Sequence, residues 1–147
     1  MEFKDVEFED VEFEDRVLAE AIGSIGGRGA AFVARRLPKN VHEIGLRLPL
    51  GLARAEARVT GLLARIGHRV APRRGERAAE RVAGRRTIRV MTGGGAWNMN
   101  PVLVTAVLTA EGPEETLLHL RAAAKEGLIR QRAGEKTAHR VAALLTD

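Results

Sequence analysis

The chain has 147 residues, which is enough for one domain with a short extension. It contains no cysteine, so disulfides, thiol nucleophiles and cysteine metal sites are excluded. Hydrophobic residues make up 45% of the chain but aromatic residues only 3%, which predicts an aliphatic core.

The net charge of +5 is unevenly distributed along the chain. Residues 1–15 carry eight acidic side chains and one lysine, a net of −7, whereas residues 16–40 carry +4 and residues 41–147 carry +8. A basic body with an acidic arm indicates either an anionic partner or an arm that neutralises the body. The alternative is that the basic charge reflects codon usage alone, because arginine outnumbers lysine twenty to four, a bias typical of GC-rich bacterial genomes.

We expect a cytoplasmic protein with no membrane span. The first fifteen residues are acidic, unlike a secretory signal. The longest weakly charged stretch, residues 17–34, is interrupted by Glu20, Arg28 and several glycines.

The acidic segment is a short repeat, in which the sequence of residues 6–10 recurs at 11–15. A five-residue period matches neither a helix face nor a strand face, and the high charge favours disorder. Residues 1–15 are therefore predicted to be a mobile tail. Its three aromatic residues, Phe3, Phe8 and Phe13, are candidate anchors for a basic, apolar groove; the alternative is a purely solvating tail.

Residues 16–40 are interpreted as a glycine-rich helical linker. Short helical pieces at 17–22 and 30–37 flank a run of glycines and the single serine, Ser24. The glycine spacing fits neither a dinucleotide fingerprint nor a Walker loop, so we expect a linker rather than a phosphate cradle.

Periodic patterns predict an α+β domain over residues 41–147. Strands are predicted at 44–48, 87–92, 102–109 and 115–124, and helices at 52–66 and 128–145. Residues 102–109 are apolar on both faces, which indicates a central strand covered by a helix on at least one side. For 115–124 the alternative is a helix opened by Pro113.

This order of elements predicts a four-stranded antiparallel sheet with two helices over one face. The order resembles the TATA-binding-protein-like and helix-grip architectures. The resemblance covers residues 41–147, concerns element order alone and implies no function. We expect residues 41–147 to fold without residues 1–15.

Arginine spacing is the most specific signal in the sequence. Between residues 65 and 89, nine arginines stand against two glutamates, and those at 69, 73, 77, 81, 85 and 89 recur every four residues. Pro72 and Gly75 exclude one continuous helix, but a short helix over 76–83 would present Arg77 and Arg81 together. Their mutual repulsion would be relieved by an anion. The candidate anion or partner site is Arg69, Arg73, Arg74, Arg77, Arg81, Arg85 and Arg86, joined by Lys136 and Arg140; the alternative is a solvated loop.

A glycine-rich loop carries the only tryptophan. Trp97, Asn98 and Asn100 are candidate contacts for a partner or ligand; the alternative is that Trp97 covers the core as a lid. The four histidines (His42, His68, His119 and His139) show no metal-ligand spacing with one another or with a carboxylate on one helix face. We therefore expect no metal, no cofactor and no catalytic residue.

The function predicted from these features is a small, non-enzymatic binding module. Its partner would be a protein surface, including its own arm or a second subunit, bound through the basic surface. One alternative is sequence-nonspecific nucleic-acid binding by the 65–89 arginines. Another is a helix-grip pocket for a hydrophobic ligand beside Trp97. The equal and opposite charges also predict that residues 1–15 cover the 65–89 surface.

Overall fold

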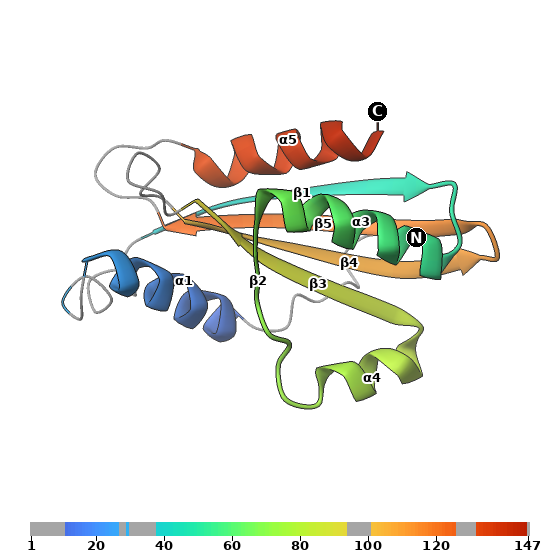
Figure 1. Ribbon diagram of the computed structural model, residues 1–147, viewed down its shortest axis with the longest axis horizontal. Helices are drawn as coiled ribbons and strands as arrows, with labels where there is room; N and C mark the ends of the chain where they lie inside the picture. The colour runs from blue at the N-terminus through green and yellow to red at the C-terminus, as the bar shows by residue number, and fades with distance from the viewer. Residues whose placement is uncertain (1–10, 27–28, 30–37, 94–100, 126–131, 147) are drawn as a thin grey trace.

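The computed structural model describes residues 11–26, 29, 38–93, 101–125 and 132–146. They form an α+β structure, an antiparallel sheet with helices on both faces (Figure 1). The strands are β1 (Lys39–Leu48), β2 (Gly67–Arg69), β3 (Arg85–Thr92), β4 (Val102–Gly112) and β5 (Glu115–Lys125). The helices are α1 (Val11–Gly26), α3 (Leu52–Ile66), α4 (Glu76–Ala83) and α5 (Ala133–Thr146).

The strands lie in the order β1-β5-β4-β3-β2, and each pairs antiparallel with its neighbours. The register aligns apolar residues into rows across the sheet. In one such row, Ile44 lies opposite Leu120, Leu120 opposite Ala106, and Ala106 opposite Ile88. The strand β4 is central, as its apolar faces predicted.

The larger core lies between the sheet and the helices α3 and α5, which share one face (Figure 1). From α3, Ala55, Val59 and Leu63 are buried at four-residue steps, on the face that the apolar period of 52–66 predicted. From α5, Val141 and Leu145 are buried in the same core, four residues apart. The helix predicted over 52–66 is confirmed with the same bounds.

The opposite face of the sheet carries a second, smaller core, which the predicted two-layer arrangement of residues 41–147 did not include. Here α1 packs Leu18 against Leu103 and Ala123. The predicted boundary after Asp15 falls inside this helix, and Phe13 and Glu14 are buried. Residues 11–15 are therefore part of a helix rather than of a mobile tail, because this copy of the repeat leads directly into the apolar residues of α1.

Several other elements differ in detail from the sequence prediction. Residues 115–124 form a strand, β5, and not a helix. The last helix begins at Ala133 instead of residue 128, because Arg132 has a φ of 52°, which a right-handed helix cannot contain. The three-residue strand β2 was not predicted, since it is too short to show a period. The predicted helical piece at 30–37 lies outside the described residues.

Within the described ranges, no helix is both long and apolar enough to cross a membrane.

Candidate functional site

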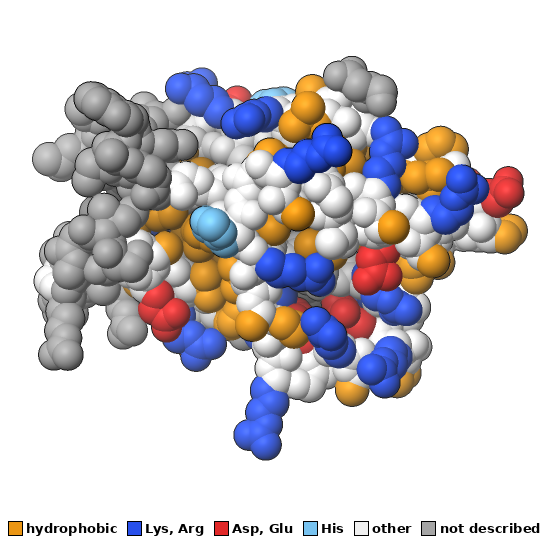
Figure 2. All heavy atoms as spheres, viewed as in Figure 1, with side chains coloured by type: hydrophobic (Ala, Val, Ile, Leu, Met, Phe, Trp, Pro, Cys, Tyr) orange, Lys and Arg blue, Asp and Glu red, His pale blue; other side chains and the backbone are white. Residues whose placement is uncertain are grey.

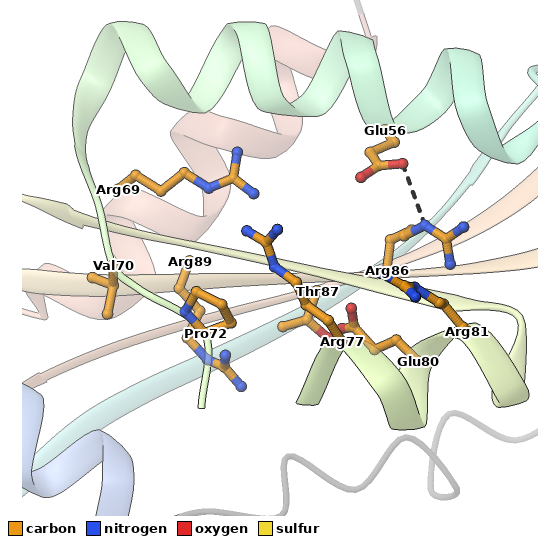
Figure 3. A pocket seen from close by; sticks show the side chains of 10 residues that line it. All are labelled: Glu56, Arg69, Val70, Pro72, Arg77, Glu80, Arg81, Arg86, Thr87 and Arg89. Carbon is orange, nitrogen blue, oxygen red and sulfur yellow. Dashed lines mark ion pairs between the residues drawn. The ribbon is translucent and has the colours of Figure 1, made fainter. Parts of the chain in front are cut away.

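A polar pocket of about 240 Å³ lies where α3, the segment after β2, α4 and β3 meet (Figure 3). Five arginines and two glutamates are among its ten lining residues, so the lining carries a formal charge of +3. Figure 2 shows basic side chains spread over this face, with acidic side chains between them. The arginines that line it are Arg69, Arg77, Arg81, Arg86 and Arg89.

Short elements and glycines position these side chains. The strand β2 lies so close to β3 that a Cβ on Gly67 would collide with the carbonyl oxygen of Met91. Gly75 and Gly84, both with positive φ, bound α4. The predicted helix over 76–83 is confirmed, and Arg77 and Arg81 both reach the pocket from it, four residues apart.

Arg89, which lines the pocket, is held by a largely buried ion pair with Glu76. Its two terminal nitrogens lie 2.6 and 2.8 Å from the carboxylate oxygens, and the backbone N–H of Arg73 donates to the same carboxylate at 3.1 Å. Burial would raise the pKa of Glu76, but the bonds from Arg89 and Arg73 outweigh it and lower that pKa. Arg89 and Glu76 therefore hold α4 against β3, since each neutralises the other.

The other arginines of the pocket form weaker ion pairs, or none, with the carboxylates that the structure describes. Arg86 Nε lies 3.4 Å from Glu56 Oε2. Among the residues that the structure describes, no carboxylate lies within ion-pair distance of Arg69, Arg77 or Arg81. The guanidinium groups of Arg69 and Arg77 point into the same space from β2 and α4 (Figure 3). Two planar donor groups that face one space can bind an anion bidentately.

Glu80 adds a buried carboxylate to the pocket wall. Its residue is 8% exposed, and Oε1 has no hydrogen-bond partner in the described part of the chain. Neither Glu80 nor Glu56 stood out in the sequence, because each lies in an ordinary charged helix pattern. They restrict where an anion can sit, since like charges repel it from their side of the pocket.

The structure brings together only some of the predicted arginines. Arg69, Arg77, Arg81 and Arg86 line the pocket, and Arg89, predicted only as a member of the spacing, joins them. Arg73, Arg74 and Arg85 do not line it.

The two predicted basic residues of α5 lie elsewhere. Lys136 and Arg140 are exposed on a helix that packs on β1 and β5, whereas the pocket lies at the β2–β3 edge. They are therefore not part of this pocket. The candidate contacts Trp97, Asn98 and Asn100 lie outside the described residues.

The aromatic anchors of the arm are described at one position. Phe13 is buried, and its ring lies 5.1 Å from the guanidinium carbon of Arg89 and 5.4 Å from that of Arg16. Phe3 and Phe8 lie outside the described residues.

The acidic side chains beside Phe13 are bound to a different basic cluster, which the sequence did not indicate. Glu14 pairs with Lys39 and Arg121, and Asp15 pairs with Lys39 and Lys125. The charges of residues 14 and 15 are thus neutralised on β1 and β5 and not on the 65–89 segment. Phe13 contacts Arg89 of the 65–89 segment, and the covering of that segment by the arm stays a prediction.

One expectation about the histidines was wrong. Glu135 and His139 are four residues apart and share a face of α5, a spacing at which a helix can offer two ligands to one metal. Their partner in space, His42, comes from β1. Sequence distance concealed this group, because 93 residues separate His42 from Glu135.

Comparison with models of known protein families and with curated proteins gives no match. The function is therefore inferred from the residues of the site.

Proposed function

We propose that this protein is a small, non-enzymatic binding module whose arginine pocket takes an acidic side chain of a protein partner. The observation that carries this proposal is the convergence of Arg69 and Arg77 on one cavity, without a carboxylate partner among the described residues. A guanidinium group matches a carboxylate in a planar, two-bond arrangement, and such charged hydrogen bonds are stronger than neutral ones.

The size and mixed charge of the pocket favour a protein partner over a nucleic acid. A nucleic-acid backbone carries a charge at every nucleotide, so it binds best to an extended surface of one sign. The pocket occupies only about 240 Å³, and Glu56 and Glu80 interrupt its positive charge. Lys136 and Arg140, which would have extended a phosphate track, lie at the other edge of the sheet.

The pocket also gives no support to a hydrophobic ligand, because charged side chains dominate its lining. The helix-grip-like element order of residues 41–147 is compatible with a binding role, but it carries no ligand preference of its own. An acidic arm from a second copy of the chain would satisfy the same chemistry as a foreign acidic segment.

The test is a titration of a labelled peptide copying residues 1–10, which has five acidic residues and one lysine, with the full chain at low salt. The double variant Arg69→Gln/Arg77→Gln should bind the peptide at least about tenfold more weakly, because a hydrogen bond to a charged group contributes roughly 1.5–3 kcal/mol. The matched control is Lys136→Gln/Arg140→Gln, which removes the same charge from the opposite edge and should bind like the unmodified chain.

Two results would contradict the proposal. An equal loss in both double variants would show that net charge alone attracts the peptide. Tighter binding to a short DNA duplex than to the peptide, with a steep salt dependence, would favour the nucleic-acid alternative.

A further inference from the structure

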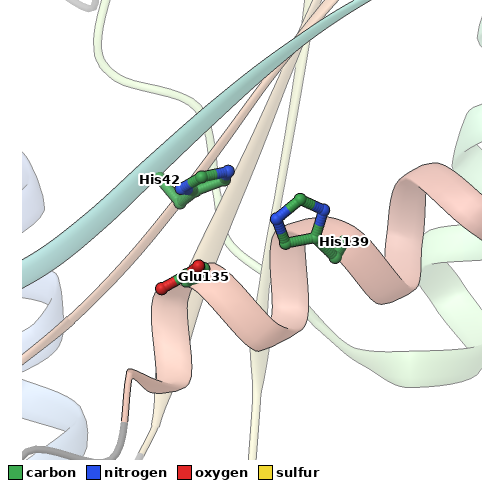
Figure 4. Close-up of side chains that lie close together, drawn as sticks. All are labelled: His42, Glu135 and His139. Carbon is green, nitrogen blue, oxygen red and sulfur yellow. The ribbon is translucent and has the colours of Figure 1, made fainter.

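A second cluster of polar side chains lies at the other edge of the sheet, where β1 meets the first turns of α5 (Figure 4). It consists of His42, Glu135 and His139. Each offers one ligand atom, and these atoms all lie within 4.8 Å of one another. The two imidazole rings are 4.7 Å apart between centroids.

The backbone holds these three residues close together. Gly134 sits so near the sheet that a Cβ there would stand 2.5 Å from the carbonyl oxygen of Asn40 and 2.8 Å from that of Ala122. The backbone N–H of Glu135 donates to Asn40 Oδ1 at 3.0 Å. The start of α5 is thus fixed on β1 two residues from His42.

The periodicities of the two elements then place the side chains on facing surfaces. Residues two apart in a strand lie on the same side, so His42 shares the side of β1 on which Asn40 meets the helix. Residues four apart in a helix are neighbours on one face, so Glu135 and His139 lie side by side. All three ligands therefore come from regular elements and not from loops, which keeps a metal geometry precise.

We propose that His42, Glu135 and His139 form a binding site for a divalent transition-metal ion such as Zn²⁺. Two imidazoles and one carboxylate are a ligand set that Zn²⁺ accepts, with metal–ligand bonds of about 2.0–2.2 Å. Tetrahedral bonds of that length place ligand atoms about 3.4 Å apart. The ligand atoms, which lie up to 4.8 Å apart, can reach a separation of about 3.4 Å through rotation of the side chains.

Three protein ligands leave at least one coordination position open in a tetrahedral site. Because His139 is exposed, that position is accessible to water or to a side chain of a partner. The ion would also cross-link the edge strand β1 to the last helix. This site lies at the opposite sheet edge from the arginine pocket and does not rest on the proposed function.

The composition of the chain makes the site easy to test. There is no cysteine to compete for Zn²⁺, and only two histidines, His68 and His119, lie elsewhere. His68 is exposed in β2 and provides a matched control.

Isothermal titration of the full chain with Zn²⁺ should give one bound equivalent with micromolar or tighter affinity. His42→Ala and His139→Ala should each weaken binding by at least about tenfold, the lower limit seen even when residues behind the ligands are changed. His68→Ala should bind like the unmodified chain. Co²⁺ in place of Zn²⁺ should give visible absorption that His139→Ala abolishes.

The melting temperature gives a second test, because it reports whether the ion stabilises the folded state. Zn²⁺ should raise the melting temperature of the unmodified chain and of His68→Ala, but not of His139→Ala, because the ion joins two elements of the folded state. His139 is exposed, so its removal leaves the core intact. Equal Zn²⁺ affinity in all four proteins, or weakening by His68→Ala as well, would overturn the site.

Discussion

Arg121 in β5 donates two hydrogen bonds to the carboxylate of Glu14 in α1, a residue 107 positions earlier in the chain. The bonds run from Nε to Oε2 at 3.0 Å and from Nη2 to Oε1 at 3.1 Å, and Lys39 donates to the same carboxylate at 2.8 Å. The Glu14 side chain is only 7% exposed. This buried pair attaches the acidic segment to the face of the sheet that α3 and α5 leave uncovered.

Replacement of Glu14 by glutamine should lower the free energy of unfolding by about 1–3 kcal/mol, because Arg121 and Lys39 lose a charged hydrogen-bond acceptor in a largely buried place. Each keeps a second carboxylate partner, since Arg121 also pairs with Glu43 and Lys39 with Asp15. Urea unfolding of the full chain would measure the change. The control is Glu12→Gln on the same helix, where the side chain is exposed and the change should stay within about 0.5 kcal/mol. Equal effects of the two substitutions would show that α1 contributes nothing through this pair.

The same carboxylates should make the fold sensitive to acid. Burial raises the pKa of Glu14, but the hydrogen bonds from Arg121 and Lys39 outweigh it, so that pKa lies below the usual glutamate value. Asp15 behaves likewise, since bonds from Lys125 and Lys39 outweigh burial and lower its pKa. A carboxyl group whose pKa is lower in the folded state stabilises the protein above its unfolded pKa, and this stability is lost as the pH falls through the folded value.

The free energy of unfolding should therefore fall as the pH drops below about 4.3, the ordinary pKa of glutamate. In Glu14→Gln this acid-dependent loss should be smaller, because one of the responsible groups no longer titrates. Urea unfolding across a pH series would measure both profiles. Parallel profiles for the two proteins would contradict the assignment.

Substitution of Glu80 should strengthen peptide binding, whereas substitution of the pocket arginines should weaken it. Its buried carboxylate opposes an acidic ligand, so Glu80→Gln should tighten binding of the peptide by about fivefold, equivalent to roughly 1 kcal/mol of like-charge repulsion. Glu111→Gln, an exposed position in the β4–β5 hairpin, removes the same charge far from the pocket and should have no effect. Unchanged affinity in Glu80→Gln would place the ligand elsewhere.

Two glycines, one inside α3 and one directly after it, should respond oppositely to alanine. A Cβ on Gly61, inside α3, would meet nothing within 4 Å, so Gly61→Ala should raise the free energy of unfolding by about 0.5–1 kcal/mol through helix propensity. A Cβ on Gly67 would collide with the Met91 carbonyl, so Gly67→Ala should displace β2 and weaken both the fold and peptide binding through Arg69. Unfolding curves and peptide titrations would separate the two. Tolerance of Gly67→Ala would show that β2 can move without harm to the pocket.

Local patterns in the sequence were sufficient for the elements whose signals lie within a few residues. The apolar stripe of α3 and the two apolar faces of β4 predict their structures, because each reflects which side of one element is buried. Pro72 and Gly75 likewise limited the helix at α4 to a short one after residue 75. The four-residue arginine spacing likewise indicated a basic region that includes Arg69, Arg77, Arg81 and Arg86.

Contacts between distant segments decided the rest. The five-residue repeat gave no sign that Phe13 and Glu14 are buried, because Arg89, Lys39 and Arg121, which hold them, lie far along the chain. The pocket needs α3 and α4 on either side of β3, and His42 meets His139 only because Gly134 lets α5 touch β1. Periodicity reports which faces are buried, whereas the pairing of those faces depends on sheet order and helix packing, which no local pattern encodes.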